Sequence, residues 1–215
     1  MKLINDLISA TNSHEIKDMV LGIYNTLVIS QQGGISSNLQ NHASYEYEYK
    51  NLSEIIGKDT KSIAQLAYSK NHVKASVGMA VINSALTLDH TRLKHINAKR
   101  VILEKGYGKI VGIIGHFPFL ESIQKEVEAL FVFERKPRDN DYPEKDIPRL
   151  LPKADVVALT ATTITNHSFE EIMKYRKQNS FTIVLGPTTP LSTILFDYGI
   201  DAVCGCRVNN IDQVV

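Results

Sequence analysis

The chain has 215 residues, of which 43% are hydrophobic and 22% are charged, and its formal net charge is +1 at pH 7. The length permits one large domain or two small ones, and the near-neutral charge argues against a dedicated nucleic-acid binder, which usually has a basic face. No apolar run is long enough to span a membrane, and Asn5 and Asp6 interrupt any signal-peptide core, so we expect a cytoplasmic protein without membrane or nucleic-acid partners.

The first part of the chain alternates between helical and strand patterns. Apolar residues at helical spacing predict one amphipathic helix, or two short ones, within residues 1–20. Residues 21–30 are β-rich, and after a Gly-containing turn residues 35–39 return as a partner strand. Residues 40–52 are polar and tyrosine-rich, which is typical of either an edge strand or an irregular loop.

Two helices follow, over residues 59–68 and 71–86, and Asp59 is suited to cap the first of them. The polar stretch 87–95 is predicted as a linker. Because strands precede helices in this half, residues 1–90 are predicted as a small α+β domain.

From residue 95 onward the pattern changes. Residues 95–105 are predicted as a short helix that ends at Gly106 in a left-handed cap. Strands are then predicted over residues 109–114, 130–134, 155–159, 181–185 and 202–204, and helices over 119–129, 168–177 and 191–198. Continuous apolar strands alternating with helices indicate a parallel sheet covered on both faces. Residues 91–215 are therefore predicted as a Rossmann-like, doubly wound α/β domain.

The turn Gly115-His116-Phe117-Pro118 ends the first strand of that sheet, and the next strand ends in the acid Glu134. Strand, turn, helix, strand and acid form the opening of a nucleotide-type βαβ unit. NAD is not favoured as the cofactor, because a dinucleotide fingerprint would have further glycines where Phe117 and Pro118 stand. His116 is of a type that binds ligands or metals and moves protons near neutral pH, although a loop histidine that caps the following helix is the alternative.

In a doubly wound sheet, ligands bind outside the carboxyl ends of the strands. That rule selects four polar or Gly/Pro-rich loops, at residues 115–118, 134–137, 160–163 and 186–190. Each loop alone could be a structural turn, a connector or a helix cap. Their convergence at one sheet edge favours a ligand site.

Cys204 and Cys206 follow at the end of the last predicted strand. Residues two apart on a strand face the same way, so both sulfurs could reach one soft metal ion. The alternative is two small buried core residues, which is the commoner role of a free cysteine.

The segment Gly112-Ile-Ile-Gly-His-Phe-Pro118, together with Glu134-Arg-Lys-Pro137 and Gly186-Pro-Thr-Thr-Pro190, resembles the putative heavy-metal chelation family of largely uncharacterised prokaryotic proteins. Residues 78–85 and 151–161 extend the resemblance over nearly the whole chain. The resemblance implies an N-terminal domain like the small domain of enolase, a Rossmann-like second domain and a ligand site in the cleft between them. The cleft residues that it implies are Asn83, Gly115, His116, Phe117, Pro118, Glu134, Thr160, Gly186, Pro187 and Pro190. Relatives commonly continue beyond the point where this chain stops, so a partner subunit of a homo-oligomer is one way to cover the sheet edge.

The leading hypothesis is a two-domain protein that binds a small polar ligand or a metal complex in the interdomain cleft. A divalent or heavy metal would use His116, Cys204 and Cys206. The rival hypothesis is a transferase or lyase acting on a heterocyclic or anionic substrate, with His116 or Glu134 as the acid–base group. A third reading is a binding or regulatory module without catalysis.

Overall fold

A three-stranded antiparallel sheet forms the first half of the molecule. The computed structural model describes residues 1–39, 53–138 and 140–210, so the predicted edge strand or loop at residues 40–52 lies outside the described residues. The strands are β1 (Asp18–Leu21), β2 (Asn25–Ile29) and β3 (Gly33–Ser37), in that spatial order. Helix α1 (Lys2–Ala10) is the one amphipathic helix near the N-terminus. A second short helix there is a wrong prediction, because β1 pairs along its whole length with β2.

The helices of the first half lie where the sequence predicts them. Helix α3 (Thr60–Ala64) is capped by Asp59, whose side chain accepts a hydrogen bond from the backbone N–H of Lys61, and a 3-10 turn over Gln65–Tyr68 continues it. Helix α4 (His72–Ala85) is buried on nearly all sides, because β2 and β3 cover one face and the 3-10 turn and α3 cover another.

The second half is a six-stranded, all-parallel sheet in the order β6-β5-β4-β7-β8-β9. Its strands are β4 (Ile110–Ile114), β5 (Ala129–Glu134), β6 (Tyr142–Pro143), β7 (Val156–Thr160), β8 (Phe181–Leu185) and β9 (Ala202–Cys204). The chain moves outward from β4 to β6 and then returns to place β7 beside β4, so the strand order reverses between β4 and β7. The predicted α/β fold class with a doubly wound parallel sheet and a small α+β unit is confirmed.

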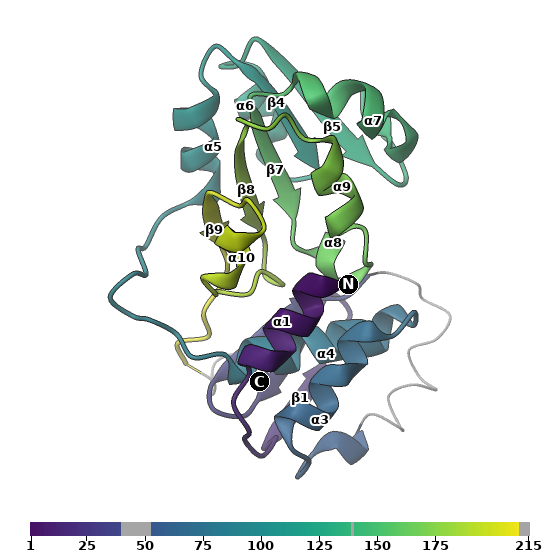
Figure 1. The fold of residues 1–215 in the computed structure, drawn as a ribbon, viewed down its shortest axis with the longest axis vertical. Coiled ribbons are helices and arrows are strands. Elements are labelled where there is room, and N and C mark those ends of the chain that lie inside the picture. The colour runs from purple at the N-terminus through teal and green to yellow at the C-terminus, as the bar shows by residue number, and fades with distance from the viewer. Residues whose placement is uncertain (40–52, 139, 211–215) are drawn as a thin grey trace.

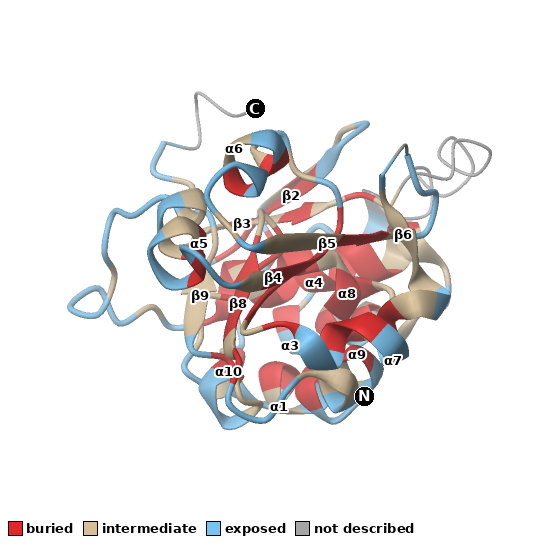
Figure 2. Cartoon of the chain, turned by 90° about the horizontal axis from the view of Figure 1, so that it is seen from above, coloured by how far each residue is buried: buried red, intermediate tan, exposed pale blue. Residues whose placement is uncertain are grey.

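Helices cover both faces of this sheet. They are α5 (Ala98–Gly106), α6 (Leu120–Gln124), α7 (Ile147–Leu150), α8 (Thr162–Thr165), α9 (Phe169–Tyr175) and α10 (Ile194–Asp197). Ile102 of α5 and Ile123 of α6 pack with one set of strand side chains, whereas α7 and α9 pack with the other set. Figure 2 shows the buried strands between these two groups of helices.

Two predicted helices are shorter than expected, and one predicted cap is wrong. The helix expected over 119–129 ends at Gln124, because the backbone groups of Glu126 and Glu128 bond to Gly108 and Lys109 at the entry to β4. The helix expected over 191–198 is reduced to α10. Gly106 is the last residue of α5 rather than a left-handed cap, and the positive φ, of 63°, is at Gly108.

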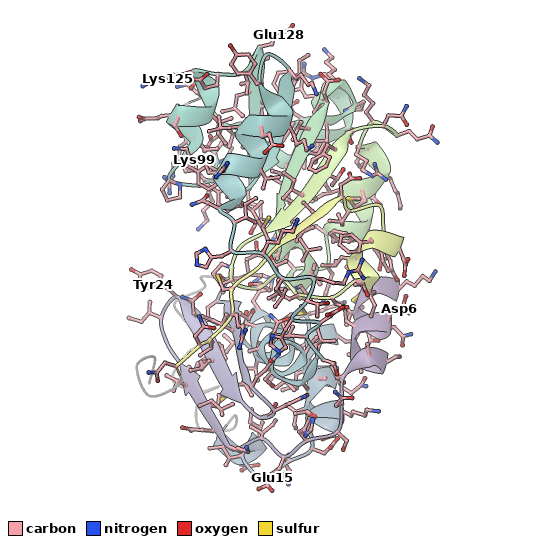
Figure 3. All side chains as sticks on the ribbon, turned by 90° about the vertical axis from the view of Figure 1, so that its left-hand side faces the viewer. Asp6, Glu15, Tyr24, Lys99, Lys125 and Glu128 are labelled. Atoms are coloured by element: carbon pink, nitrogen blue, oxygen red, sulfur yellow. The ribbon has the colours of Figure 1, made fainter. Side chains whose placement is uncertain are left out.

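The carboxyl edge of the parallel sheet faces the first half of the molecule. In Figure 3, Lys125 and Glu128 mark the opposite, amino edge, and Glu15 marks the far end of the first half. In Figure 1, β7 and β8 run toward α1 and α4. The carboxyl ends of the parallel strands therefore face the first half.

The two halves share one hydrophobic core and are joined by polar contacts. Buried side chains such as Leu7 and Val157 belong to the same cluster. The Tyr198 hydroxyl donates to Asp6 Oδ2 at 2.6 Å, and burial together with this bond raises the pKa of Tyr198. The predicted boundary at residues 90 and 91 falls between α4 and α5 and stays a prediction. Within the described residues, no helix is both long and apolar enough to cross a membrane.

Candidate functional site

The four predicted loops begin at the same edge of the sheet. The first backbone N–H beyond a strand bonds to the neighbouring strand in three of them: Gly115 to Phe133 O at 2.9 Å, Ala161 to Leu185 O at 2.9 Å and Gly186 to Cys204 O at 3.1 Å. These three loops therefore leave the sheet at the same height along the strand direction as the neighbouring strand end to which they bond.

Glycine is required where two of these loops turn. Gly115 has a φ of 101° and Gly186 a φ of 108°, which side-chain-bearing residues rarely adopt. A Cβ at Gly115 would also lie 3.0 Å from Thr160 Cγ2. The missing side chain thus lets the Gly115 turn pass beside the end of β7, at the point where the strand order reverses.

His116 is held by an acid that the sequence patterns did not select. Its Nδ1 lies 3.1 Å from Asp141 Oδ2, and the same oxygen accepts a hydrogen bond from the backbone N–H of Arg138 at 3.0 Å. The Asp141 side chain is 4% exposed, whereas that of His116 is 28% exposed. A carboxylate on one ring nitrogen orients the imidazole and leaves Nε2 facing outward, an arrangement shared by metal-binding and acid–base histidines.

This geometry predicts the tautomer of His116. In its neutral form the ring should have its proton on Nδ1, because Asp141 can only accept a hydrogen bond there. Long-range ¹⁵N NMR should therefore show a protonated Nδ1 and a bare Nε2, and Asp141→Ala should shift the population toward the Nε2–H form. An unchanged tautomer in Asp141→Ala would contradict the assignment.

The other predicted residues near His116 make local contacts. Glu134 Oε2 accepts from the backbone N–H of Arg135 at 2.9 Å, at the exposed end of β5. Thr160 Oγ1 and Thr162 Oγ1 are 2.9 Å apart as the chain turns into α8. Phe117 stacks on Phe119 with ring centroids 5.2 Å apart, and Pro118 is exposed. α8 begins after Ala161 without a side-chain cap, so the capping alternative for this loop is not confirmed.

Asn83 meets the loop after β8, on the other side of the switch point. Its Nδ2 donates to Ile35 O at 2.8 Å and to Thr188 O at 3.0 Å. The Thr188 hydroxyl in turn accepts from the backbone N–H of Ser37 at 2.8 Å. The rigid segment Gly186–Pro190, which contains Pro187, is thereby attached to β3 and α4.

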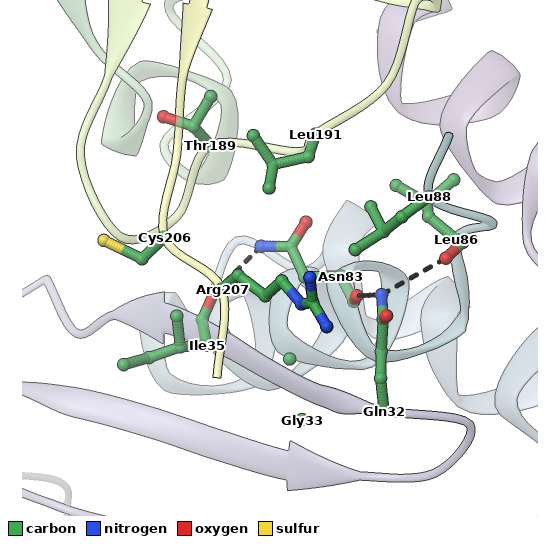
Figure 4. Close-up of a pocket in the computed structure, with 11 residues that line it drawn as sticks. Gln32, Gly33, Ile35, Asn83, Leu86, Leu88, Thr189, Leu191, Cys206 and Arg207 are labelled. Carbon is green, nitrogen blue, oxygen red and sulfur yellow. Dashed lines mark hydrogen bonds between the residues drawn. The ribbon is translucent and has the colours of Figure 1, made fainter. Parts of the chain in front are cut away.

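A pocket lies at this junction, and we call it the Asn83 pocket (Figure 4). Its lining includes Gly34, Ile35, Asn83, Thr189, Cys206 and Arg207. Two of its side-chain oxygens, Asn83 Oδ1 and Thr189 Oγ1, are buried and have no hydrogen-bond partner among the residues that the structure describes. Asn83 and Cys206 are the predicted site residues that line the pocket, whereas His116 and Glu134 do not. Gly115 and Gly186 are two strands apart, or roughly 10 Å, so the predicted residues divide between the Asn83 pocket and the His116 turn.

The two cysteines differ in their surroundings. β9 ends at Cys204, which is half-buried, and Cys206 lies beyond it, exposed at the pocket. Partial desolvation raises the pKa of both thiols. In the part of the chain that the structure describes, no group of three or more His, Cys, Asp or Glu side chains is placed to hold a metal ion. His116, Cys204 and Cys206 are therefore not gathered around one ion.

Comparison with known proteins matches each half of the chain to a family model, and the two models have the same description. Residues 97–215 match one family model and residues 4–86 match a second, and both families are described as putative heavy-metal chelation. An uncharacterised protein of Methanocaldococcus jannaschii is 25% identical over 167 residues, which are 74% of this chain and 64% of that protein. The chain thus matches slightly less than two thirds of the length of this curated relative.

Two crystal structures share the fold. A protein of unknown function from Desulfitobacterium hafniense has a TM-score of 0.82 at 23% identity, covering 93% of this chain and 83% of that one. Another, from Pyrococcus horikoshii, has a TM-score of 0.79 at 20% identity, covering 99% and 89%. At these identities the likeness shows the fold alone.

Proposed function

The chain belongs to the putative heavy-metal chelation family, whose model matches residues 97–215, and from that premise we propose that it binds a small polar ligand or a metal complex in the Asn83 pocket. The observation that carries the proposal is the pair of buried oxygens without partners, Asn83 Oδ1 and Thr189 Oγ1. Leaving a buried polar group unpaired costs about 1–3 kcal/mol. A ligand that bonds to these oxygens would offset that cost.

The donor set of the pocket favours a complex over a bare ion. The side chains that could contact a metal are one thiol, from Cys206, two amide oxygens, from Asn83 and Gln32, and one hydroxyl, from Thr189. Closed heavy-metal sites usually have several thiolate or imidazole ligands. These residues do not fit a bare ion, so a metal would have to bring ligands of its own.

Native mass spectrometry of the protein, purified without added chelators, tests this proposal. We expect a discrete extra mass on the wild-type protein and much less of it on Thr189→Val. Thr165→Val is the matched control, because Thr165 Oγ1 is also buried without a partner but lies in α8, outside the pocket lining. Absence of any bound mass, or equal loss in both variants, would contradict the proposal.

The Cys206 thiol supplies a pH-dependent reporter of the pocket. Because its pKa is raised, less thiolate is present at a given pH than in a free cysteine, and the thiolate is the nucleophile. We expect iodoacetamide to alkylate Cys206 slowly at neutral pH, with a rate that rises with pH and levels off above the range of a free thiol. Peptide mass spectrometry measures the rate, and Cys206→Ser identifies the signal. A rate that levels off in the pH range of a free cysteine, or at lower pH, would refute the prediction.

A second candidate function is enzymatic and is favoured by the His116–Asp141 pair. With its ring oriented by a buried carboxylate, His116 would act as an acid–base group toward a heterocyclic or anionic substrate. The exposed cations Lys136 and Arg138 lie in the adjoining loop and would favour a negative charge. To test this function, any molecule recovered by mass spectrometry is incubated with the protein. The wild type should convert that molecule, and His116→Asn should not.

Cytoplasmic location and assembly into a homo-oligomer remain proposals made from the sequence. Size measurement in solution tests the second.

A further inference from the structure

One end of the Asn83 pocket requires a hydrogen-bond donor from its occupant. Both partners of Asn83 Nδ2 are backbone carbonyl oxygens, which only accept, so the orientation of the amide is determined by its bonds. The group left without a partner is therefore the oxygen Oδ1. Figure 4 shows this oxygen on the side of Leu191, away from Ile35. An N–H of a ligand would satisfy it.

The lining of the pocket also includes a cation. Arg207 lines the pocket and is exposed, and its Nη1 lies 3.3 Å from His90 Nδ1. Within the described residues, no carboxylate forms an ion pair with Arg207. The neighbouring acid, Asp89, is bonded to the hydroxyl of Thr91 at 2.6 Å and to its backbone N–H at 3.1 Å. A guanidinium without an acidic partner is suited to bind a carboxylate with two parallel hydrogen bonds.

Apolar side chains line the pocket together with these two polar groups. Ile35, Leu86, Leu88 and Leu191 all line the pocket. They come from β3, the C-terminal end of α4 and the loop before α10, so both halves of the molecule supply the apolar walls. Such walls suit a compact hydrocarbon or ring body.

We infer that the Asn83 pocket selects a small carboxylate that also has an N–H donor on a compact apolar body. The N–H would bond to Asn83 Oδ1, and the carboxylate would bind Arg207. This inference rests on the proposed function and narrows it to a chemical class, which includes amino-carboxylate ligands that could accompany a metal.

Protection of Cys206 from iodoacetamide measures occupancy by any molecule, charged or neutral, because Cys206 lines the pocket. The probes are two acids, pyroglutamate and N-acetylglycine. Each acid is compared with its primary amide, which lacks the negative charge, and with its N-methyl analogue, which lacks the N–H of the acid. Each probe is tested at concentrations up to about 10 mM, so that a Kd in the millimolar range is still detected. We expect at least one acid to protect Cys206. Its amide and its N-methyl analogue should each bind at least about tenfold more weakly, a factor that corresponds to one good hydrogen bond or ion pair.

The variant Arg207→Met should abolish the advantage of the acid over its amide. Arg92→Met is the control, because Arg92 is an exposed cation of the segment that contains His90 and does not line the pocket. Equal protection by acid and amide in the wild type, or an advantage that persists in Arg207→Met, overturns the inference while leaving pocket binding intact. Failure of both acids also overturns it, and native mass spectrometry then decides separately whether the pocket binds any other ligand.

Discussion

Replacing Gly78 with alanine is expected to lower the free energy of unfolding by about 3 kcal/mol or more. A Cβ at this position of α4 would lie 2.1 Å from Ala67 N and 2.6 Å from Leu66 C, which are backbone atoms of the adjoining 3-10 turn. Neither atom can move away without separating the turn from the helix. In an isolated helix the same replacement would be stabilising by about 1 kcal/mol, so the sign of the effect reports the packing.

Urea unfolding measures this change, and Gly57→Ala is the control. Gly57 has a φ of 79° and nothing within 4 Å of a built Cβ. Its replacement should therefore cost only the backbone strain, about 1–2 kcal/mol. A Gly78→Ala variant as stable as the wild type would show that α4 and the turn are not packed as closely as described.

Asn83→Ala is expected to cost about 2–3 kcal/mol of stability and to weaken ligand binding in the Asn83 pocket. The change removes the donor to Ile35 O and to Thr188 O, and an abandoned buried carbonyl costs about 1–3 kcal/mol. Because those two bonds attach the loop after β8 to β3 and α4, hydrogen exchange in residues 186–190 should also accelerate.

A double-mutant cycle with Thr188→Val separates this attachment from a general loss of stability. Thr188 Oγ1 accepts from Ser37 N across the same junction, so both changes loosen one contact. The two costs should then sum to more than the cost of the double variant, since coupled neighbours are not additive. Additive costs, or a neutral Asn83→Ala, would argue against a joint role for these residues.

The elements of the parallel sheet were predictable because their signals are local. The strands Phe181–Leu185 and Ala202–Cys204 have the predicted bounds, since each is a short apolar run between turn-forming residues. Such runs and the helices between them predict a parallel sheet. They also predict that four loops meet at one edge, because parallel strands end on the same side. The N-terminal cap of α3 follows from Asp59 in the same way.

The residues that complete each candidate site were not predictable, because their contacts join distant parts of the chain. Asp141 lies in a turn without a distinctive spacing and matters only because folding places it 3.1 Å from His116. Arg207 and Thr189 belong to the Asn83 pocket only because the two halves dock there.

The sequence by itself thus determined the fold class, the order of the strands along the chain and the sheet edge at which the four loops meet. Tertiary structure alone decided that the predicted residues divide into two groups, with His116 beside Asp141 and Asn83 beside the Gly186–Pro190 loop. The physical reason is that apolar periodicity specifies which face of each element is buried, whereas side-chain partners depend on how the elements pack. Asn83 and Thr188 are 105 positions apart and meet only in the folded protein.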